Sequence, residues 1–376
     1  MGLATQNLTD APLARPLYGI GKADKWHTSS EILQHTDRMM NAREVVDSLV
    51  QHGLKEITAS LDLEKCDQLP TAIGGFGDIY QGVTFTGRVI SLKCLQPTFI
   101  LNKEGRKQLK RAARELYTWS KCNHPGVLPL FGLALYRGQL AMVSPWMENG
   151  NLRSYLSARR PSSTNRLTLT IEIAGALNYL HNAGVVHGDL KAANISISGD
   201  DTPRLADFGC AKLQEYSLLF SSTRVGADVS IRWSAPEIIL GDGTPTYETD
   251  VYALGMSDFF AQIAFFVLKE TFTNSDPYAG VHEAAVWMKI MKQVLPQRPE
   301  KDMPTGDNQA DHLWMLLNQC WASDPLNRPT AGGVRDKLQE IVSMYPLERE
   351  MEDPITGVGG GQERAWDPGY QTPTIR

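Results

Sequence analysis

The sequence predicts an α+β protein of two lobes, in which a small β-rich lobe precedes a larger, mainly helical lobe. The first observation is that short β-branched and apolar runs alternate with turns from Leu69 to about Met147, interrupted by one helical segment. The second is that apolar residues recur at helical spacing from Asn151 onwards. Two lobes of this kind enclose a cleft, which is where a binding site is expected.

The composition and charge are those of an ordinary globular protein. The 376 residues are 42% hydrophobic and 21% charged, which is enough to bury a large core without disulfide bonds. Lysine and arginine number 37 against 42 aspartate and glutamate residues, a net charge of −5. Because there is neither a basic excess nor a basic block to neutralise phosphates, we expect no nucleic-acid partner.

The cysteines and the apolar segments predict a soluble protein of the cytosol or the nucleus, and we expect it to be cytoplasmic. Five cysteines lie far apart without a Cys-x-x-Cys pair, which favours reduced thiols over a disulfide framework or a zinc site. Residues 1–20 lack the apolar run of a signal peptide, and the most apolar window, residues 259–268, is too short to span a bilayer. We therefore expect no membrane insertion.

We expect one main domain with an extension at each end. The domain covers residues 67–347, with an N-lobe at 67–147 and a C-lobe at 148–347. It follows an N-terminal extension, residues 1–66, and precedes a Gly- and Pro-rich tail, residues 348–376, which is expected to be disordered.

The N-terminal extension contains one segment with helical periodicity. Apolar residues recur there at three- and four-residue steps, which predicts an amphipathic helix over about 42–58. These residues are Val46, Leu49, Val50, Leu54 and Ile57. The helix is expected to pack on the main domain, and a partner-binding helix is the alternative.

Glycines between two expected strands form the first candidate site, Ala72-Ile73-Gly74-Gly75-Phe76-Gly77-Asp78-Ile79-Tyr80. Backbone amides of glycines can approach a phosphate with no Cβ in the way, although a hairpin with a bulge would use the same residues. On the next expected strand, alternation places Lys93 inward beneath this turn. A helix over about 106–120 carries Glu115, which could pair with Lys93 or lie solvated on an exposed face.

The densest polar cluster is His187-Gly188-Asp189-Leu190-Lys191-Ala192-Ala193-Asn194. Asp189 could orient a hydroxyl proton, and Lys191 could neutralise a transferring phosphoryl group. Asn194 could bind a divalent cation together with Asp207, which follows in Leu205-Ala206-Asp207-Phe208-Gly209. Magnesium prefers such oxygen ligands and shares them with phosphates.

Taken in order, these motifs resemble those of the eukaryotic protein kinase domain. The resemblance covers roughly residues 67–347 and includes the later motif Ala235-Pro236-Glu237. Within the family, the chain is most similar to the tyrosine-kinase-like serine/threonine kinases, and especially to their fungal (basidiomycete-type) relatives. The phrases that carry this finer likeness are Ser144 to Leu152, His187-Gly188-Asp189 and Arg232-Trp233-Ser234-Ala235-Pro236-Glu237.

The resemblance implies roles for individual catalytic residues. Asp189 would be the catalytic base, assisted by Lys191, whose presence favours serine or threonine as the acceptor. Lys93 would bind the α- and β-phosphates of ATP and Glu115 would hold Lys93. The metal ligands for Mg²⁺ would be Asn194 and Asp207.

The resemblance also implies a nucleotide-binding surface and several structural residues. The nucleotide would contact the glycine turn, the following strands and a hinge with Ser144 as gatekeeper. These positions are Ala72, Ile73, Gly74, Gly75, Phe76, Gly77, Ile79, Ser91, Lys93, Ser144, Pro145, Trp146 and Met147. Asp250 would brace the catalytic loop, Arg328 would pair with Glu237, and the side chains of Trp119, His187 and Phe208 would line up as a spine.

The implied function is transfer of the γ-phosphoryl group of ATP to Ser or Thr hydroxyls of proteins in intracellular signalling. The partner would be a protein substrate, and the upstream regulator cannot be read from the sequence. The alternatives are a pseudokinase that acts as a nucleotide-binding signalling scaffold and, less favoured, a kinase of small molecules. The long segment ending at Ala235-Pro236-Glu237 suits peptide docking rather than a small acceptor.

The sequence departs from the kinase pattern at four places. Ala72 replaces the first glycine of the turn, and Gly188 replaces the arginine that usually grips an activation-loop phosphate. Ser91 and Ser196 replace apolar residues that sandwich adenine, which would weaken ATP binding. About ten extra residues, 257–266, lengthen the central helix of the large lobe and would shift its apolar face.

Overall fold

The protein is described from a computed structural model. The structure describes residues 42–51, 53–74, 77–95, 112–113, 115–159, 163–213, 230–241, 243–256, 277–278, 280–300 and 303–345. Several expectations lie outside these residues: the nucleotide contacts at Gly75 and Phe76, the extra residues 257–266 and the tail.

The small lobe is built on an antiparallel sheet of five strands, in the order β1-β2-β3-β5-β4. The strands are β1 (Ala72–Gly74), β2 (Gly77–Val83), β3 (Val89–Cys94), β4 (Gly132–Tyr136) and β5 (Gln139–Pro145). Residues 115–120 are helical and bury Leu116 and Trp119, as the apolar stripe predicted. The alternation of β3 buries Ile90, Leu92 and Cys94 on one face and leaves Lys93 half-buried on the other.

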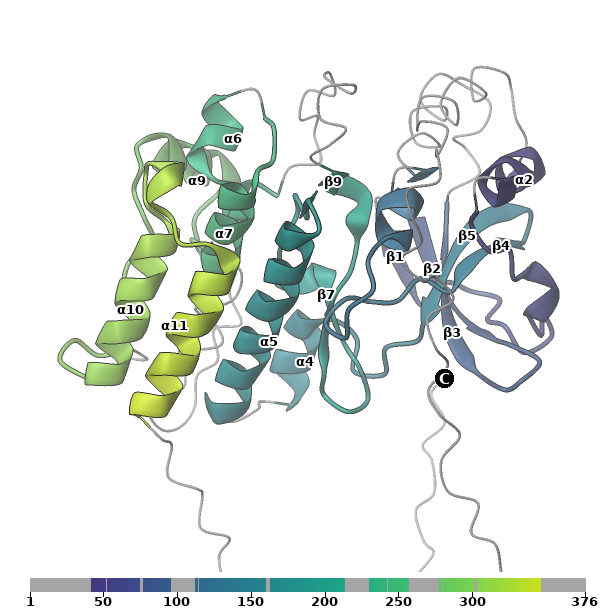
Figure 1. Ribbon diagram of the computed structural model, residues 1–376, viewed down its shortest axis with the longest axis horizontal. Helices are drawn as coiled ribbons and strands as arrows, with labels where there is room; N and C mark the ends of the chain where they lie inside the picture. Colours follow the sequence, from purple (N-terminus) through teal and green to yellow (C-terminus); the bar gives the residue numbers. More distant parts are fainter. Residues whose placement is uncertain are drawn as a thin grey trace, which may run out of the picture.

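The N-terminal helix α2 (Ala42–Gln51) packs on the sheet of the small lobe (Figure 1). It buries Val45, Val46 and Leu49 in the same core cluster as Leu133 of β4 and Met142 of β5. The expected extent of 42–58 was wrong at its C-terminal end, because Gly53 donates its amide to the carbonyl of Val50 and closes the helix.

After α2, the chain adds to the open edge of the sheet. The carbonyl of Lys55 accepts from the amide of Leu133 (2.8 Å), and the amide of Ile57 donates to the carbonyl of Leu133 (2.9 Å). A 3₁₀ turn follows at Thr58–Ser60. Ile57, Leu61 and Cys66 then form a second core cluster on the other face of the sheet. Residues 54–66 therefore cover both an edge and a face of this sheet.

The large lobe is mainly helical and lies beside the small lobe (Figure 1). The long helix α5 packs against α11, and together with α7 and α10 these helices bury the core of this lobe. The helices are α4 (Leu152–Arg159), α5 (Ser163–Asn182), α6 (Pro236–Leu240), α7 (Tyr247–Met256), α9 (Glu283–Met291), α10 (Asn308–Cys320) and α11 (Ala331–Met344). The predicted α+β fold of two lobes is thus confirmed.

Short strands at the edge of the large lobe carry the polar loops that face the small lobe. β6 (Val185–Val186) pairs with β9 (Lys212–Leu213), and β7 (Ile195–Ile197) pairs with β8 (Pro203–Leu205). Single 3₁₀ turns lie at Ala192–Asn194, Phe208–Cys210, Ile231–Trp233 and Pro325–Asn327. None of the helices within the described ranges is long and apolar enough to cross a membrane.

Candidate active site

Lys93 joins the two lobes through two carboxylates. Its Nζ donates to Oε1 of Glu115 (2.8 Å) and to Oδ1 of Asp207 (3.2 Å). The alternative of a solvated Glu115 is excluded, because its side chain is only 4% exposed. Burial alone would lower the pKa of Lys93, but the two carboxylates outweigh it and raise that pKa above its usual value. Lys93 is therefore a firmly held cation where the two lobes meet.

Asp207 is ionised for the complementary reason. Burial opposes its charge, but the ammonium of Lys93 and the amide of Gly209, which donates to Oδ1, lower the pKa of Asp207. Its backbone is left-handed, with φ of 62°. A non-glycine residue in this region is strained, and such strain is held in place at functional sites by the surrounding contacts.

Three aromatic rings pack against one another close to Asp207 and Glu115 in the sequence. The ring of Phe208 stacks on Trp119, with centroids 6.0 Å apart, and meets the ring of His187 at 5.7 Å. Trp119 lies one helical turn after Glu115, so the stack connects the helix of the small lobe to the loops of the large lobe. This alignment is the expected one.

The catalytic cluster forms a hydrogen-bonded group around Asp189. Nζ of Lys191 donates to Oδ2 of Asp189 (2.8 Å), and Nδ2 of Asn194 donates to the same oxygen (2.9 Å) and to the Asp189 carbonyl (2.8 Å). Asn194 is buried, whereas the side chains of Asp189 and Lys191 are 9% and 20% exposed. The carboxylate of Asp189 and the ammonium of Lys191 are therefore adjacent, and both are partly accessible to solvent.

The residue that sequence reasoning missed is Ser230. Its Oγ donates to Oδ1 of Asp189 (2.8 Å) and accepts from Nζ of Lys191 (2.7 Å), so it closes a ring with these two side chains. Ser230 lies 41 residues after Asp189 in the sequence. Ser230 lies two residues before the phrase Arg232 to Glu237, but no local pattern distinguishes it from the serines around it.

Asp250 holds the catalytic loop from the core of the large lobe, as predicted. It lies on α7, is 1% exposed and accepts from the amides of His187 and Gly188, each at 2.8 Å. Its Oδ2 also lies 3.0 Å from Nε2 of His181. Because a buried carboxylate must be paired, these bonds fix the loop that presents Asp189.

Asn194 and Asp207 are neighbours across the β7–β8 hairpin. The amide of Ala206 donates to the carbonyl of Asn194 at 2.9 Å, which places the residue next to Ala206, Asp207, beside Asn194. An amide oxygen and a carboxylate are hard oxygen donors of the kind Mg²⁺ takes. The donor types of these two residues therefore fit a magnesium ion.

The expected nucleotide surface is partly described. In the strand register, Ile79 lies opposite Lys93, and Ser91 lies opposite Ser144. Ser144 is 5% exposed, whereas Pro145, Trp146 and Met147 are half-buried where β5 ends. Three expected contacts lie on β1: Ala72 and Ile73 are exposed at the hairpin, and Gly74 pairs with Gly77 across it.

The sequence matches a model of the family described as protein tyrosine and serine/threonine kinase over residues 70–338. This match covers more than two thirds of the chain. The chain belongs to this kinase family. The matched range lies within the predicted domain, residues 67–347, whose boundaries stay a prediction.

Among curated proteins, the kinase is 28% identical to serine/threonine-protein kinase STY46 of Arabidopsis thaliana, over 77% of this chain and 46% of the relative. It is 26% identical to STY17 of the same plant, over 78% of this chain and 47% of the relative. A receptor kinase with an L-type lectin domain, also from Arabidopsis thaliana, is 38% identical over 49% of this chain and 27% of the relative. The chain thus spans less than half of the length of each of these relatives.

Two further contacts of the kinase lie on either side of the site. Nη2 of Arg328 donates to Oε2 of Glu237 (2.9 Å), and its guanidinium lies over the ring of Tyr252 at 5.0 Å, so the expected pairing with Glu237 is present. At the other end of the site, Gly188 has φ of 79°, and a Cβ there would lie 2.6 Å from the carbonyl oxygen of Cys210. The kinase therefore has a close backbone contact next to Asp189.

Proposed function

We propose that this kinase transfers the γ-phosphoryl group of ATP to Ser or Thr hydroxyls of proteins in intracellular signalling. The observation that carries the proposal is the ring formed by Asp189, Lys191 and Ser230. It presents a carboxylate that can accept a hydroxyl hydrogen bond beside an ammonium that can neutralise phosphate oxygens. The relatives named as serine/threonine-protein kinases support the choice of acceptor.

In the proposed reaction, each residue contributes position and charge rather than a covalent bond. Asp189 orients the acceptor hydroxyl and accepts its hydrogen bond, and Lys191 neutralises charge on the moving phosphoryl group. Lys93, held by Glu115, binds the phosphates of ATP.

Magnesium is proposed as the metal cofactor. Asn194 and Asp207 would hold it, since their side chains carry oxygen donors of the kind Mg²⁺ prefers and the two residues are close along the β7–β8 hairpin. When bound, Mg²⁺ neutralises phosphate charge on ATP. The hinge residues Ser144 to Met147, the glycine turn and Ile79 are proposed to contact the nucleotide.

The finer placement also stays a proposal. We place the kinase in the tyrosine-kinase-like group, near its fungal (basidiomycete-type) members, on the phrases Ser144 to Leu152 and Arg232 to Glu237. We propose a cytoplasmic protein with no nucleic-acid partner, because its net charge of −5 offers no basic surplus. The pseudokinase alternative is disfavoured, because the charged groups needed for transfer are assembled.

The test is Mg-ATP turnover on a generic Ser/Thr substrate, with Asp189→Ala as the control for contaminating kinase. Transfer that disappears in Asp189→Ala supports the proposal. A thermal-shift titration with Mg-ATP accompanies it, because a ligand that binds only the native state raises its stability. A Mg-ATP shift without transfer would contradict the proposal and favour the scaffold.

A further inference from the structure

Arg232 is surrounded by the carbonyls of a distant turn. It lies in the 3₁₀ turn Ile231–Trp233, two residues after Ser230. Its Nη1 donates to the carbonyls of Pro277 (2.8 Å) and Tyr278 (3.1 Å), and its Nη2 donates to the carbonyl of Val281 (2.7 Å). A guanidinium can satisfy three converging carbonyls because its donors lie in a rigid plane, whereas an ammonium is a single point charge.

The turn that Arg232 holds is strained and is fixed from its other side as well. Tyr278 has φ of 59°, which a non-glycine residue adopts only where other contacts compensate. Its hydroxyl donates to the carbonyl of Val294 at 2.9 Å. Burial raises the pKa of Tyr278 to about 12, so the hydroxyl keeps its proton at neutral pH.

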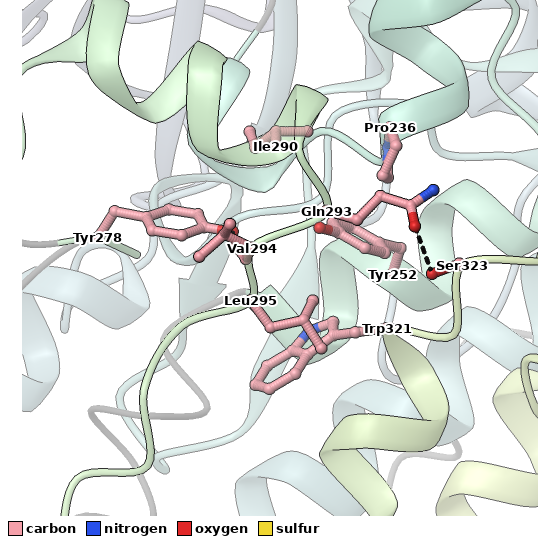
Figure 2. Close-up of a pocket in the computed structure, with 9 residues that line it drawn as sticks. All are labelled: Pro236, Tyr252, Tyr278, Ile290, Gln293, Val294, Leu295, Trp321 and Ser323. Atoms are coloured by element: carbon pink, nitrogen blue, oxygen red, sulfur yellow. Dashed lines mark hydrogen bonds between the residues drawn. The ribbon is translucent and has the colours of Figure 1, made fainter.

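Figure 2 shows the side chain of Tyr278 beside Val294 at a small pocket, which Pro236 of α6 and Tyr252 of α7 also line. The turn is followed directly by α9, whose N-cap is His282. Arg232 therefore attaches the loop before α6 to the start of α9. Pro236, which follows this loop, and Tyr278, which lies in this turn, line the same pocket of the large lobe.

The other end of the Arg232 loop contacts the catalytic group. Ser230 bonds to Asp189 and Lys191, and Oγ of Ser234 donates to the carbonyl of Ser230 at 3.1 Å. A displacement of this loop would move Ser230 and the space in front of Asp189. The pair of Lys93 and Glu115, by contrast, comes from β3 and the small-lobe helix.

We propose that Arg232 is a positioning residue for the protein acceptor: its three bonds to Pro277, Tyr278 and Val281 hold the loop against which the acceptor hydroxyl is aligned with Asp189. The inference rests on the proposed function. Because misplacement by about 1 Å can cost about 100-fold in rate, loss of this attachment reduces transfer to protein without reducing use of ATP.

The experiment compares steady-state kinetics of the full chain and four variants: Arg232→Met, Arg232→Lys, Tyr278→Phe and, as the control, Arg335→Met. Arg335 is half-buried on α11, with its side chain 36% exposed, and bonds to its neighbour Asp336 rather than to the loop before α6. For Arg232→Met we expect kcat/KM for a Ser peptide to fall about tenfold to 100-fold, by analogy with other misplaced groups. KM for ATP and the rate of ATP hydrolysis to water should stay within about twofold of the wild type.

Partial rescue separates positioning from mere stability. Arg232→Lys keeps the positive charge but loses the planar set of N–H donors. Its kcat/KM for the peptide should therefore lie between those of the wild type and Arg232→Met. Tyr278→Phe removes the bond to Val294 from the other side of the turn and should also lower kcat/KM for the peptide. This variant keeps the inference open to test even where Arg232→Met fails to fold.

Three results would overturn the inference. One is peptide kinetics equal to the wild type in Arg232→Lys and Tyr278→Phe. Another is a parallel loss of peptide transfer and ATP hydrolysis, which would indicate general destabilisation. The third is a loss of the same size in Arg335→Met. If the wild type itself shows no transfer that depends on Asp189, the proposed function fails first, and this inference fails with it.

Discussion

Oγ of Ser230 lies 2.8 Å from Oδ1 of Asp189 and 2.7 Å from Nζ of Lys191, so one hydroxyl links the carboxylate and the ammonium of the catalytic group. The link joins the catalytic loop to the loop before α6. It therefore makes the geometry at Asp189 depend on a residue that no catalytic motif in the sequence includes.

Replacement of Ser230 by alanine should lower kcat for a Ser/Thr peptide by about tenfold to 100-fold. The reason is that hydrogen bonds to charged groups contribute about 1.5–3 kcal/mol, and each 1.4 kcal/mol is tenfold in rate. Ser230→Thr keeps the hydroxyl and serves as the matched control. Steady-state kinetics with saturating Mg-ATP measures both variants, and equal rates for Ser230→Ala and wild type would contradict the assigned role.

Replacement of Glu115 by glutamine should lower kcat/KM for ATP by about tenfold to 100-fold. The amide has the same shape but no charge to hold Lys93, which would then bond mainly to Asp207. The control is Glu340→Gln, an exposed residue of α11 that lies 3.5 Å from Lys337. The measurement is the transfer rate as a function of ATP concentration. Equal values of kcat/KM for ATP in Glu115→Gln and Glu340→Gln would contradict the role of Glu115 in holding Lys93.

Alanine at Gly188 should destabilise the protein more than alanine at Gly138. Both glycines are left-handed, with φ of 79° and 74°, so both substitutions carry a backbone strain of about 1 kcal/mol or more. Only at Gly188 would the new Cβ meet a neighbour, the carbonyl oxygen of Cys210 at 2.6 Å; no atom comes within 4 Å at Gly138. Urea unfolding measures the stability of the two variants. Equal urea midpoints for Gly188→Ala and Gly138→Ala would contradict the predicted clash with Cys210.

Truncation of Leu49 to alanine should cost about 2–5 kcal/mol of unfolding free energy, because it opens a cavity in a packed core. Leu49 is 2% exposed, whereas its neighbour Val50 is 38% exposed, so Val50→Ala should change stability by less than about 0.5 kcal/mol. A single cooperative urea transition with a lowered midpoint in Leu49→Ala would show that α2 folds together with the small lobe. Equal midpoints for the two variants would contradict the packing of α2.

Stability in acid should depend on Asp207. Its folded pKa lies below the unfolded value of about 3.9, so the unfolded chain binds the proton more readily. The stability from its pairing with Lys93 is therefore present above about pH 4 and is lost as the pH falls through the folded pKa. Asp207→Asn lacks this contribution and should show a shallower loss of stability below about pH 4 than the wild type. Urea midpoints against pH test this, with the exposed residue Asp336→Asn as the control.

Much of the site could be predicted from the sequence because its motifs are local. Asp189, Lys191 and Asn194 lie within six residues, and a loop of that length must place them close together. The alternation of a strand was enough to place Lys93 inward, away from buried Leu92. Helical periodicity likewise placed Leu116 and Trp119 in the core beside Glu115.

Other features could not be predicted, because they depend on which distant segments meet. The end of α2 at Gln51 was missed, since Leu54 and Ile57 keep the apolar spacing of a helix although the chain there pairs with β4. Neither the bond from Ser230 to Asp189 nor the carbonyls around Arg232 can be seen in sequence spacing, because the partners lie about forty or more residues away.

The sequence by itself determined the two-lobed α+β fold, the catalytic motifs and their order along the chain, because periodicity and motif spacing are local properties of the polypeptide. Only the tertiary structure decided that Glu115 and Asp207 share Lys93, that Ser230 completes the catalytic group and that Arg232 joins its loop to the turn before α9. Hydrogen bonds between charged groups act over about 3 Å, so they form only where folding brings the partners together.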